Sequence, residues 1–322
     1  MTDLEKAILK TITYFDVFNY PLTDWEIQKW LYKYPGTTKL SEIRNVLANS
    51  QILKKELILS EGFYSLRGRE NIYLQRKQNN NLAERKYNRA LRLVRLYRFV
   101  PYIKMVAVCN SLSYSNAADD SDIDFFIITK KNKIWIARFL AIILVGLSGF
   151  RPRVGHTRDA YCLSFFIDES KLDIRDLSLG KHDIYFTYWL RQLMPIYNPA
   201  GLYEKFLAAN SWTNSFLPNA YANKFVREVT SGQTSRRWRK FIGVLLSPPF
   251  ISRGLDAVYR QLQMRILGRN LKAIINIDTR VVVNDRVLKL HNNDRREYFY
   301  KKWKELIRPL LDKYEEPSAQ II

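Results

Sequence analysis

A polar, acidic turn between two apolar segments constrains the fold of this chain more than any other sequence feature. Residues 104–109 and 123–129 are strand-like, and the turn between them ends in Asp122-Ile123-Asp124. Two carboxylates placed two residues apart at the start of a strand leave the same face of a sheet. The sequence therefore predicts a pair of carboxylates at the edge of a buried sheet.

Three strand-like segments and one apolar helix predict an α/β core over residues 100–181. The segments are 104–109, 123–129 and 160–167, and a helical pattern over 134–148 separates the last two. Strands that alternate with helices are typical of α/β folds, because a crossover helix returns the chain to the same sheet. A small mixed sheet is therefore expected.

Residues 1–68 show the order of elements found in a winged helix. Three helical patterns, the second opened by the capping box Thr23-Asp-Trp-Glu26, precede strand-like segments at 52–59 and 63–66. The functional interpretation is nucleic-acid binding through the third helix. The alternative is a packing or dimerisation module, because the third helix carries few cations.

A strongly basic helical pattern over 69–99 links this module to the core, with Arg85, Arg89 and Arg92 among its cations. A basic helix can follow a phosphate backbone, although a solvated charged face is the commoner role. Residues 182–322 are mainly helical in pattern. The predicted fold class is thus α/β (α+β): a small mixed sheet flanked by an N-terminal winged helix and a helical C-terminal region.

The chain is strongly basic, with 52 Lys and Arg against 31 Asp and Glu and a formal net charge of +21. Such an excess predicts polyanionic partners: nucleic acid, a nucleotide or an anionic membrane surface. With 47% hydrophobic and 14% aromatic residues the chain has ample material for a core. This composition excludes a disordered or collagen-like chain.

The cysteines and the apolar segments predict a cytoplasmic protein. Cys109 and Cys162 lie in apolar runs and are expected to be reduced core residues. The first residues lack the basic and apolar regions of a secretory signal. The most apolar stretch, 139–150, is shorter than the roughly 20 residues that a membrane span needs, so a buried helix is expected there.

The acidic pair has the chemistry of a divalent-cation site. Asp122 and Asp124 offer carboxylate oxygens, which are the ligands that Mg²⁺ prefers. Two such ions can help deprotonate an attacking hydroxyl and neutralise the charge that develops on a transferred phosphoryl group. Upstream, Asn110-Ser111 follows a strand, and Ser111 could cap a helix whose backbone amides face phosphate oxygens.

This arrangement resembles the nucleotidyltransferase superfamily typified by DNA polymerase beta, in which Gly-Gly or Gly-Ser is followed after a spacer by Asp-hydrophobic-Asp. Here Asn110-Ser111 stands for Gly-Ser and Asp122-Ile123-Asp124 for the metal-binding pair. The resemblance implies that the two aspartates hold Mg²⁺ or Mn²⁺ and act in catalysis, and that Asn110 and Ser111 contact the NTP. The winged helix looks like those attached to some bacterial and archaeal members.

Other acidic motifs fit this stretch less well. An EF-hand beginning at Asp120 would need Gly where Phe125 stands and Glu where Lys131 stands. A phosphatase of the haloacid dehalogenase type, or a glycosyltransferase Asp-x-Asp, would place the strand before the acidic pair, whereas the longest apolar run follows it. A solvated acidic turn explains Asp119 and Asp120 easily, but explains less well why a basic chain gathers four carboxylates here.

The third metal-binding carboxylate usual in the superfamily has no clear counterpart. Residues 160–168 offer Ser164 in mid-strand and Asp168 at the end. Strict alternation places both on one face, about 13 Å apart at roughly 3.3 Å per residue, so only one can occupy the third position. We expect Ser164 to face the acidic pair. The three histidines show no ligand spacing, and none is expected to act: His156, His182 and His291.

The predicted function is Mg²⁺-dependent transfer of a nucleoside monophosphate from an NTP to an acceptor hydroxyl, with residues 100–181 as the nucleotidyltransferase domain. The alternative is a catalytically degenerate protein of the same fold that acts as a nucleotide- or nucleic-acid-binding regulator. Asn110 in place of Gly and the missing third carboxylate favour this alternative. Nucleic acid would bind through the winged helix and the basic linker.

Overall fold

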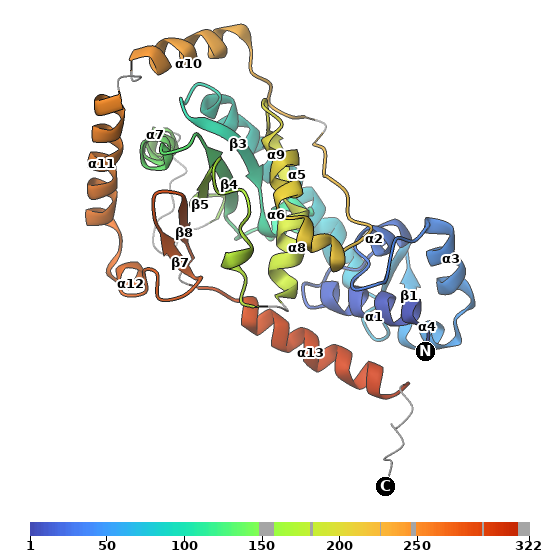
Figure 1. The fold of residues 1–322 in the computed structure, drawn as a ribbon. Helices are drawn as coiled ribbons and strands as arrows, with labels where there is room; N and C mark the ends of the chain where they lie inside the picture. Colours follow the sequence, from blue (N-terminus) through green and yellow to red (C-terminus); the bar gives the residue numbers. More distant parts are fainter. Residues whose placement is uncertain (148–157, 181–182, 226, 246–248, 292, 315–322) are drawn as a thin grey trace.

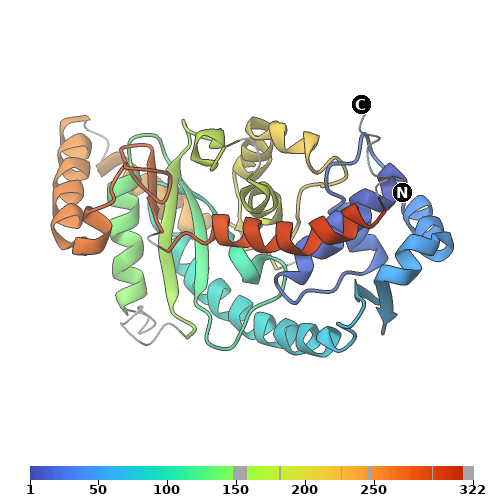
Figure 2. The ribbon, with the colours of Figure 1, turned by 90° about the horizontal axis from the view of Figure 1, so that it is seen from below.

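A computed structural model describes residues 1–147, 158–180, 183–225, 227–245, 249–291 and 293–314. A six-stranded mixed sheet lies at its centre with helices on both faces, and a smaller helical unit with a hairpin lies at one side (Figure 1, Figure 2). The helices are α1 (Asp3–Asp16), α2 (Asp24–Lys29), α3 (Leu40–Asn49), α4 (Gln51–Glu56), α5 (Ile72–Tyr97), α6 (Asn110–Ser113), α7 (Ile134–Leu147), α8 (Ile184–Gln192), α9 (Leu202–Ala209), α10 (Gln233–Leu245), α11 (Pro249–Ile266), α12 (Arg269–Lys272) and α13 (Arg296–Asp312), with short 3₁₀ turns η1 (Arg175–Leu177) and η2 (Ser211–Ser215). The strands are β1 (Leu57–Ser60), β2 (Phe63–Leu66), β3 (Ile103–Val108), β4 (Ile123–Thr129), β5 (Tyr161–Asp168), β6 (Met194–Tyr197), β7 (Val281–Val283) and β8 (Val287–Leu290).

Residues 1–68 form helices followed by an antiparallel hairpin, as the sequence predicts. Thr23 opens α2 as a capping box. Its hydroxyl accepts a hydrogen bond from the Glu26 amide at 3.2 Å, and the Glu26 carboxylate accepts one from the Thr23 amide at 2.9 Å. A bridge between Leu22 and Tyr64 places a further extended segment beside the hairpin.

The strand predicted over 52–59 is wrong in its first part, which is helical. The Ser50 hydroxyl accepts a hydrogen bond from the Leu53 amide at 3.1 Å and so begins α4. Leu53 is buried within α4, and Leu57, also buried, is the first residue of the strand that follows. The capping serine therefore outweighs the strand-like run of apolar residues, and the chain becomes extended only at β1.

The N-terminal unit shares its core with helices from the other end of the chain. Tyr14 of α1 stacks on Tyr188 of α8 with ring centroids 4.1 Å apart. Trp303 of α13 is buried in the same cluster, and its indole nitrogen donates to the Lys10 carbonyl at 3.1 Å. Residues 1–68 are therefore joined to the body of the protein through a common apolar core.

The central sheet has the strand order β6-β3-β4-β5-β8-β7. β4 and β5 are parallel, as expected for strands joined through a helix, and the other neighbours are antiparallel. Helices α5 and α7 cover one face, and α8 and α9 cover the other (Figure 1). The predicted α/β class with a mixed sheet is confirmed, and so are the predicted strands β3, β4 and β5 to within a residue.

The sheet extends beyond the predicted α/β core. Three strands from residues 182–322 complete it: β6 pairs with β3, and β8 joins β5 to β7. The mainly helical pattern predicted for residues 182–322 did not indicate β6, which is too short to stand out from the helices around it. One sheet thus spans the boundary predicted at residue 181.

The basic segment 69–99 forms α5, and its inner face packs on the sheet. Several of its cations bind carboxylates of this chain. Arg85 lies 2.7 Å from Asp119, and Lys86 lies 3.0 Å from the buried Asp159. Arg89 lies 3.2 Å from Asp159. Some cations of this helix therefore form ion pairs within the fold, in addition to charging the surface.

No helix in the described part of the chain combines the length and the apolar character needed to cross a membrane. The apolar helix α7 runs from Ile134 to Leu147, close to the predicted span, and packs its inner face on the sheet. The remainder of the stretch 139–150 lies outside the described residues.

Candidate active site

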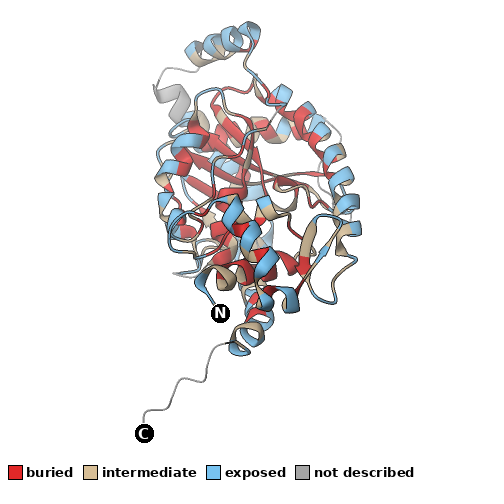
Figure 3. Cartoon of the chain, turned by 90° about the vertical axis from the view of Figure 1, so that its right-hand side faces the viewer, coloured by how far each residue is buried: buried red, intermediate tan, exposed pale blue. Residues whose placement is uncertain are grey.

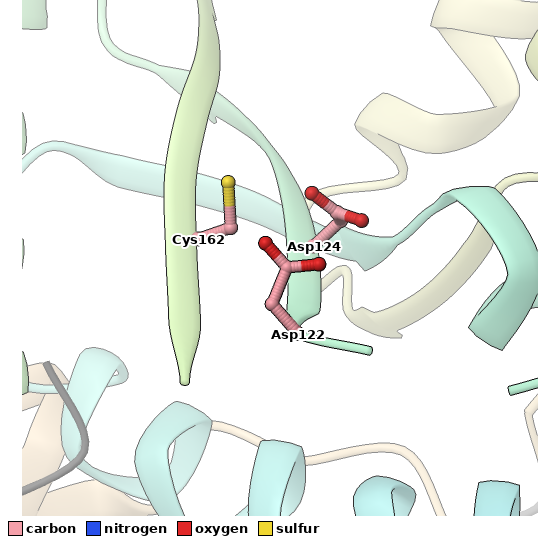
Figure 4. A group of neighbouring side chains, drawn as sticks. All are labelled: Asp122, Asp124 and Cys162. Carbon is pink, nitrogen blue, oxygen red and sulfur yellow. The ribbon is translucent and has the colours of Figure 1, made fainter. Parts of the chain in front are cut away.

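The two aspartates leave one face of β4, as predicted. Ile123 and Phe125 point to the core under α5 and α7, whereas Phe126 points to the core under α8 and α9. Asp122 and Asp124 follow the parity of Phe126. Their carboxylate oxygens and the sulfur of Cys162 lie within 4.8 Å of one another (Figure 4). The sequence thus predicted the pair but not its third member.

Cys162 reaches the pair because of the register between the two parallel strands. Asp124 pairs with Cys162, whereas Phe126 pairs with Phe165, so β5 carries one extra residue opposite β4. The bulge reverses the alternation that the sequence predicted: Phe165 joins the face of Cys162 and Phe166 turns to the other. Because both cysteines were predicted to be core residues, the sequence did not indicate that the half-buried Cys162 joins the acidic pair.

Ser164 lies two residues beyond Cys162 on β5, and it contacts Cys162 and His291 rather than either aspartate in the described hydrogen bonds. It accepts a hydrogen bond from the Cys162 sulfur at 3.3 Å, and its hydroxyl lies 3.1 Å from Nε2 of His291. Cys162, rather than Ser164, is the register neighbour of Asp124. Ser164 therefore connects the site to His291, a histidine that was not expected to act. His156 and His182 lie outside the described residues.

Asp168 serves the opposite end of the sheet. It pairs with Thr129 at the far end of β4 and its side chain is fully buried. Its carboxylate accepts hydrogen bonds from the Asn132 amide at 3.1 Å and from the Ser170 amide at 2.8 Å. Asp168 thus holds two turns in place, and the structure does not bring it together with Asp122 and Asp124.

Asn110 lies directly against the acidic pair. It has a left-handed backbone with φ of 55°, which Asn tolerates better than most residues. Its side-chain amide donates to Asp124 Oδ2 at 2.7 Å. Ser111 follows in α6 and lines the adjacent cavity, but it does not cap that helix, which has four residues and begins after Cys109. Asn110 therefore orients Asp124.

The two carboxylates disfavour each other's charge. Burial and the nearby charge of Asp124 raise the pKa of Asp122 from 3.8 to about 7. Burial, together with the two carboxylates, also raises the pKa of the Cys162 thiol. Both raised pKa values reflect buried negative charge without a balancing cation, so a bound cation would favour the ionised carboxylates.

A cavity of about 420 Å³ opens beside the pair, with Asp122 in its wall. Aromatic side chains from α8 and α13 form one side, where Tyr185 and Phe299 stack with centroids 5.3 Å apart. Basic side chains from β8 and from the segment that leads into α13 form another. The remaining lining residues are Phe18, Asn110, Ser111, Tyr114, Phe165, Phe186, Trp189, Lys289, His291, Asn293, Asp294, Arg295 and Arg296.

A buried ion network supports the basic wall. Arg296 lies 2.6 Å from Asp294 and 3.0 Å from Asp183, and Lys289 lies 3.3 Å from Asp294. Burial opposes ionisation of Asp294, but hydrogen bonds and charge from Arg296 outweigh it and lower the pKa to about 2. Burial and the charge of Arg296 lower the pKa of Lys289 to about 8. Burial, with the nearby Lys289, also lowers the pKa of His291.

Sequence patterns could not predict that these basic side chains lie near the acidic pair, because Lys289, His291 and Arg296 follow it by more than 160 positions. Comparisons with models of protein families, with curated proteins and with solved structures gave no match. The resemblance to the nucleotidyltransferase superfamily therefore remains an expectation from the motif. Function is inferred from the site itself.

Proposed function

We propose that the chain transfers a nucleoside monophosphate from an NTP to an acceptor hydroxyl, with Mg²⁺ or Mn²⁺ held by Asp122 and Asp124. One observation carries the proposal: two carboxylates and a third ligand atom converge within 4.8 Å beside a cavity. The two carboxylates suit a hard divalent cation, although the sulfur of Cys162 is a softer ligand, and the raised pKa of Asp122 marks a site that gains from a cation.

The residues around the pair suggest how an NTP would bind. Such an ion, when bound, would neutralise charge on the transferred phosphoryl group. Asn110 and Ser111 lie at the turn beside Asp124 and face the same cavity. Arg295 is exposed in the cavity wall and can meet phosphate oxygens, whereas Arg296 is committed to Asp294. The triphosphate would thus lie between this turn and the segment before α13.

The aromatic side of the cavity suits a flat group. Tyr185 and Phe299 belong to an apolar surface that also includes Trp189. A base or an aromatic acceptor could stack there, since every base offers a π-face. The acceptor hydroxyl would then approach from the side of His291, which lines the same cavity and contacts Ser164.

A second candidate is a nucleotide- or nucleic-acid-binding regulator that keeps the fold without the chemistry. Two observations favour it: the Asn110 amide occupies one oxygen of Asp124, and Cys162 stands where a third carboxylate would complete the site. If such a regulator contacts nucleic acid through α5, it would use exposed Arg92 and Arg95, because Arg85 and Arg89 bind carboxylates of the chain.

Calorimetric titration with each NTP, with and without Mg²⁺ or Mn²⁺, followed by mass analysis of the protein, tests the proposal. We expect metal-dependent binding of at least one NTP and, if a side chain of this protein is the acceptor, a mass increase of one nucleoside monophosphate. Metal-independent binding without any transfer product would support the regulator. Absence of NTP binding under all conditions would contradict the transferase and the nucleotide-binding form of the regulator, and would leave only a regulator that binds nucleic acid.

The variant Cys162→Asp is expected to strengthen metal binding on the order of tenfold and to raise transfer activity. Position 162 is the register neighbour of Asp124, so a carboxylate there can join the other two around an ion. Calorimetry with Mn²⁺ and a turnover assay measure the effect. Cys162→Ser is the matched control, because it keeps the size without the charge. Equal metal affinity in both variants would exclude position 162 from the metal site.

A further inference from the structure

α10 presents apolar and basic side chains to solvent on the same helix. Trp238 and Phe241 lie three residues apart and are 48% and 62% exposed. Arg236, Arg237 and Lys240 are exposed beside them. A helix buried against its own protein would turn these aromatic rings inward. Packing within this protein therefore does not explain the two aromatic rings of α10.

The side chain of Arg239 attaches the inner side of α10 to the body. Arg239 donates to the Tyr197 hydroxyl at 2.5 Å and to the Ile103 carbonyl at 2.6 Å. Ser235 is buried on the same side. These contacts orient the helix with Trp238 and Phe241 on its solvent-facing side.

The charge around α10 is one-sided. From Gln233 to Lys272 the sequence contains one acidic residue, Asp256, among many lysines and arginines. Asp256 is turned inward and accepts a hydrogen bond from the Ile136 amide at 3.0 Å. The solvent-facing side of this segment thus carries cations without acidic partners of its own. Its field attracts a dense negative surface.

We propose that α10 is a membrane-surface helix that lies on an anionic lipid bilayer, with Trp238 and Phe241 in the interface and Arg236, Arg237 and Lys240 at the lipid head groups. Interfacial helices of this kind combine aromatic anchors with a basic polar face. Charge complementarity selects the bilayer, because an apolar protein groove would match the aromatic rings but not the surrounding cations.

The location of α10 leaves the candidate active site accessible. α10 and α13 lie at opposite ends of the molecule in two perpendicular views (Figure 1, Figure 3). α13 begins at Arg296 in the cavity wall. A bilayer against α10 would therefore approach the other end of the sheet. Membrane binding at α10 and chemistry at Asp122 and Asp124 can be tested independently.

Sedimentation of the full chain with phosphatidylcholine vesicles, with and without phosphatidylglycerol, tests this proposal. We expect binding only to the anionic vesicles and its decline with added salt. The triple variant Arg236→Gln, Arg237→Gln, Lys240→Gln should reduce partitioning on the order of a hundredfold. The double variant Trp238→Ser, Phe241→Ser should reduce it at least tenfold. Unfolding curves should show that both variants stay folded.

Matched controls replace equally exposed groups elsewhere. Lys54→Gln, Lys55→Gln, Lys304→Gln removes as much charge, and Leu59→Ser, Leu74→Ser removes apolar groups that are 55% and 49% exposed. Both controls should bind the anionic vesicles like the parent chain. The proposal is overturned if the parent chain does not bind, if controls and α10 variants lose binding equally, or if the α10 variants lose duplex DNA or self-association instead.

Discussion

The free energy of unfolding is expected to rise when an NTP and Mg²⁺ are added together, and the double variant Asp122→Asn, Asp124→Asn is expected to lose that rise. A ligand at 100 times its Kd stabilises the folded state by about 2.7 kcal/mol. The variant removes the carboxylate ligands proposed for the metal, so transfer activity should fall to background. Thermal unfolding with and without ligands, and a turnover assay, measure both effects.

The pH dependence of the metal-free protein separates this loss from a loss of folding. Asp122 has a pKa of about 7 in the folded chain against an ordinary value of 3.8. The folded state therefore holds a proton that the unfolded state releases, and stability declines as pH rises from about 4 to about 7. Removing the charge should leave the metal-free variant at least as stable as the parent above pH 7.

A control for this experiment comes from the same acidic turn. Asp119→Asn, Asp120→Asn removes two carboxylates that lie outside the group formed with Cys162, and Asp119 pairs with Arg85 at the surface. The ligand-induced stabilisation should survive in this control. If the control loses the stabilisation as fully as the Asp122, Asp124 variant, the acidic turn binds cations only diffusely and the assigned pair is wrong.

Arg296→Ala is expected to destabilise the protein by about 3–5 kcal/mol, the usual cost of leaving buried charges without their partner. Arg296 binds Asp294 and Asp183, donates to the Leu177 carbonyl at 2.8 Å and to the Thr279 hydroxyl at 2.7 Å, and is almost completely buried. Its loss would leave the buried Asp183 without its cation and Asp294 with Lys289 alone. Denaturant unfolding measures the change.

Arg260→Ala is the matched control for this prediction. Arg260 lies 3.1 Å from Asp285, but both side chains are about half exposed. Exposed ion pairs contribute roughly 0–1 kcal/mol, so the control should remain close to the parent. A loss below about 1 kcal/mol for Arg296→Ala as well would show that the buried network does not stabilise the cavity wall.

The sequence by itself determined the local elements, including both positions of the acidic pair. Side-chain periodicity is a local property, so the start of β4 and the burial of its alternate faces could be predicted. The long helices were predictable for the same reason. The error at α4 was also local, since the Ser50 cap competes with a strand-like run over the same residues.

Only the tertiary structure decided what surrounds the acidic pair. The bulge in β5 selected Cys162 as the neighbour of Asp124, and pairing of β8 with β5 brought His291 to Ser164. These contacts depend on strand register and on residues far apart in sequence, which periodicity does not encode. The sequence therefore predicted the carboxylates, whereas long-range packing determined their partners and shaped the cavity beside them.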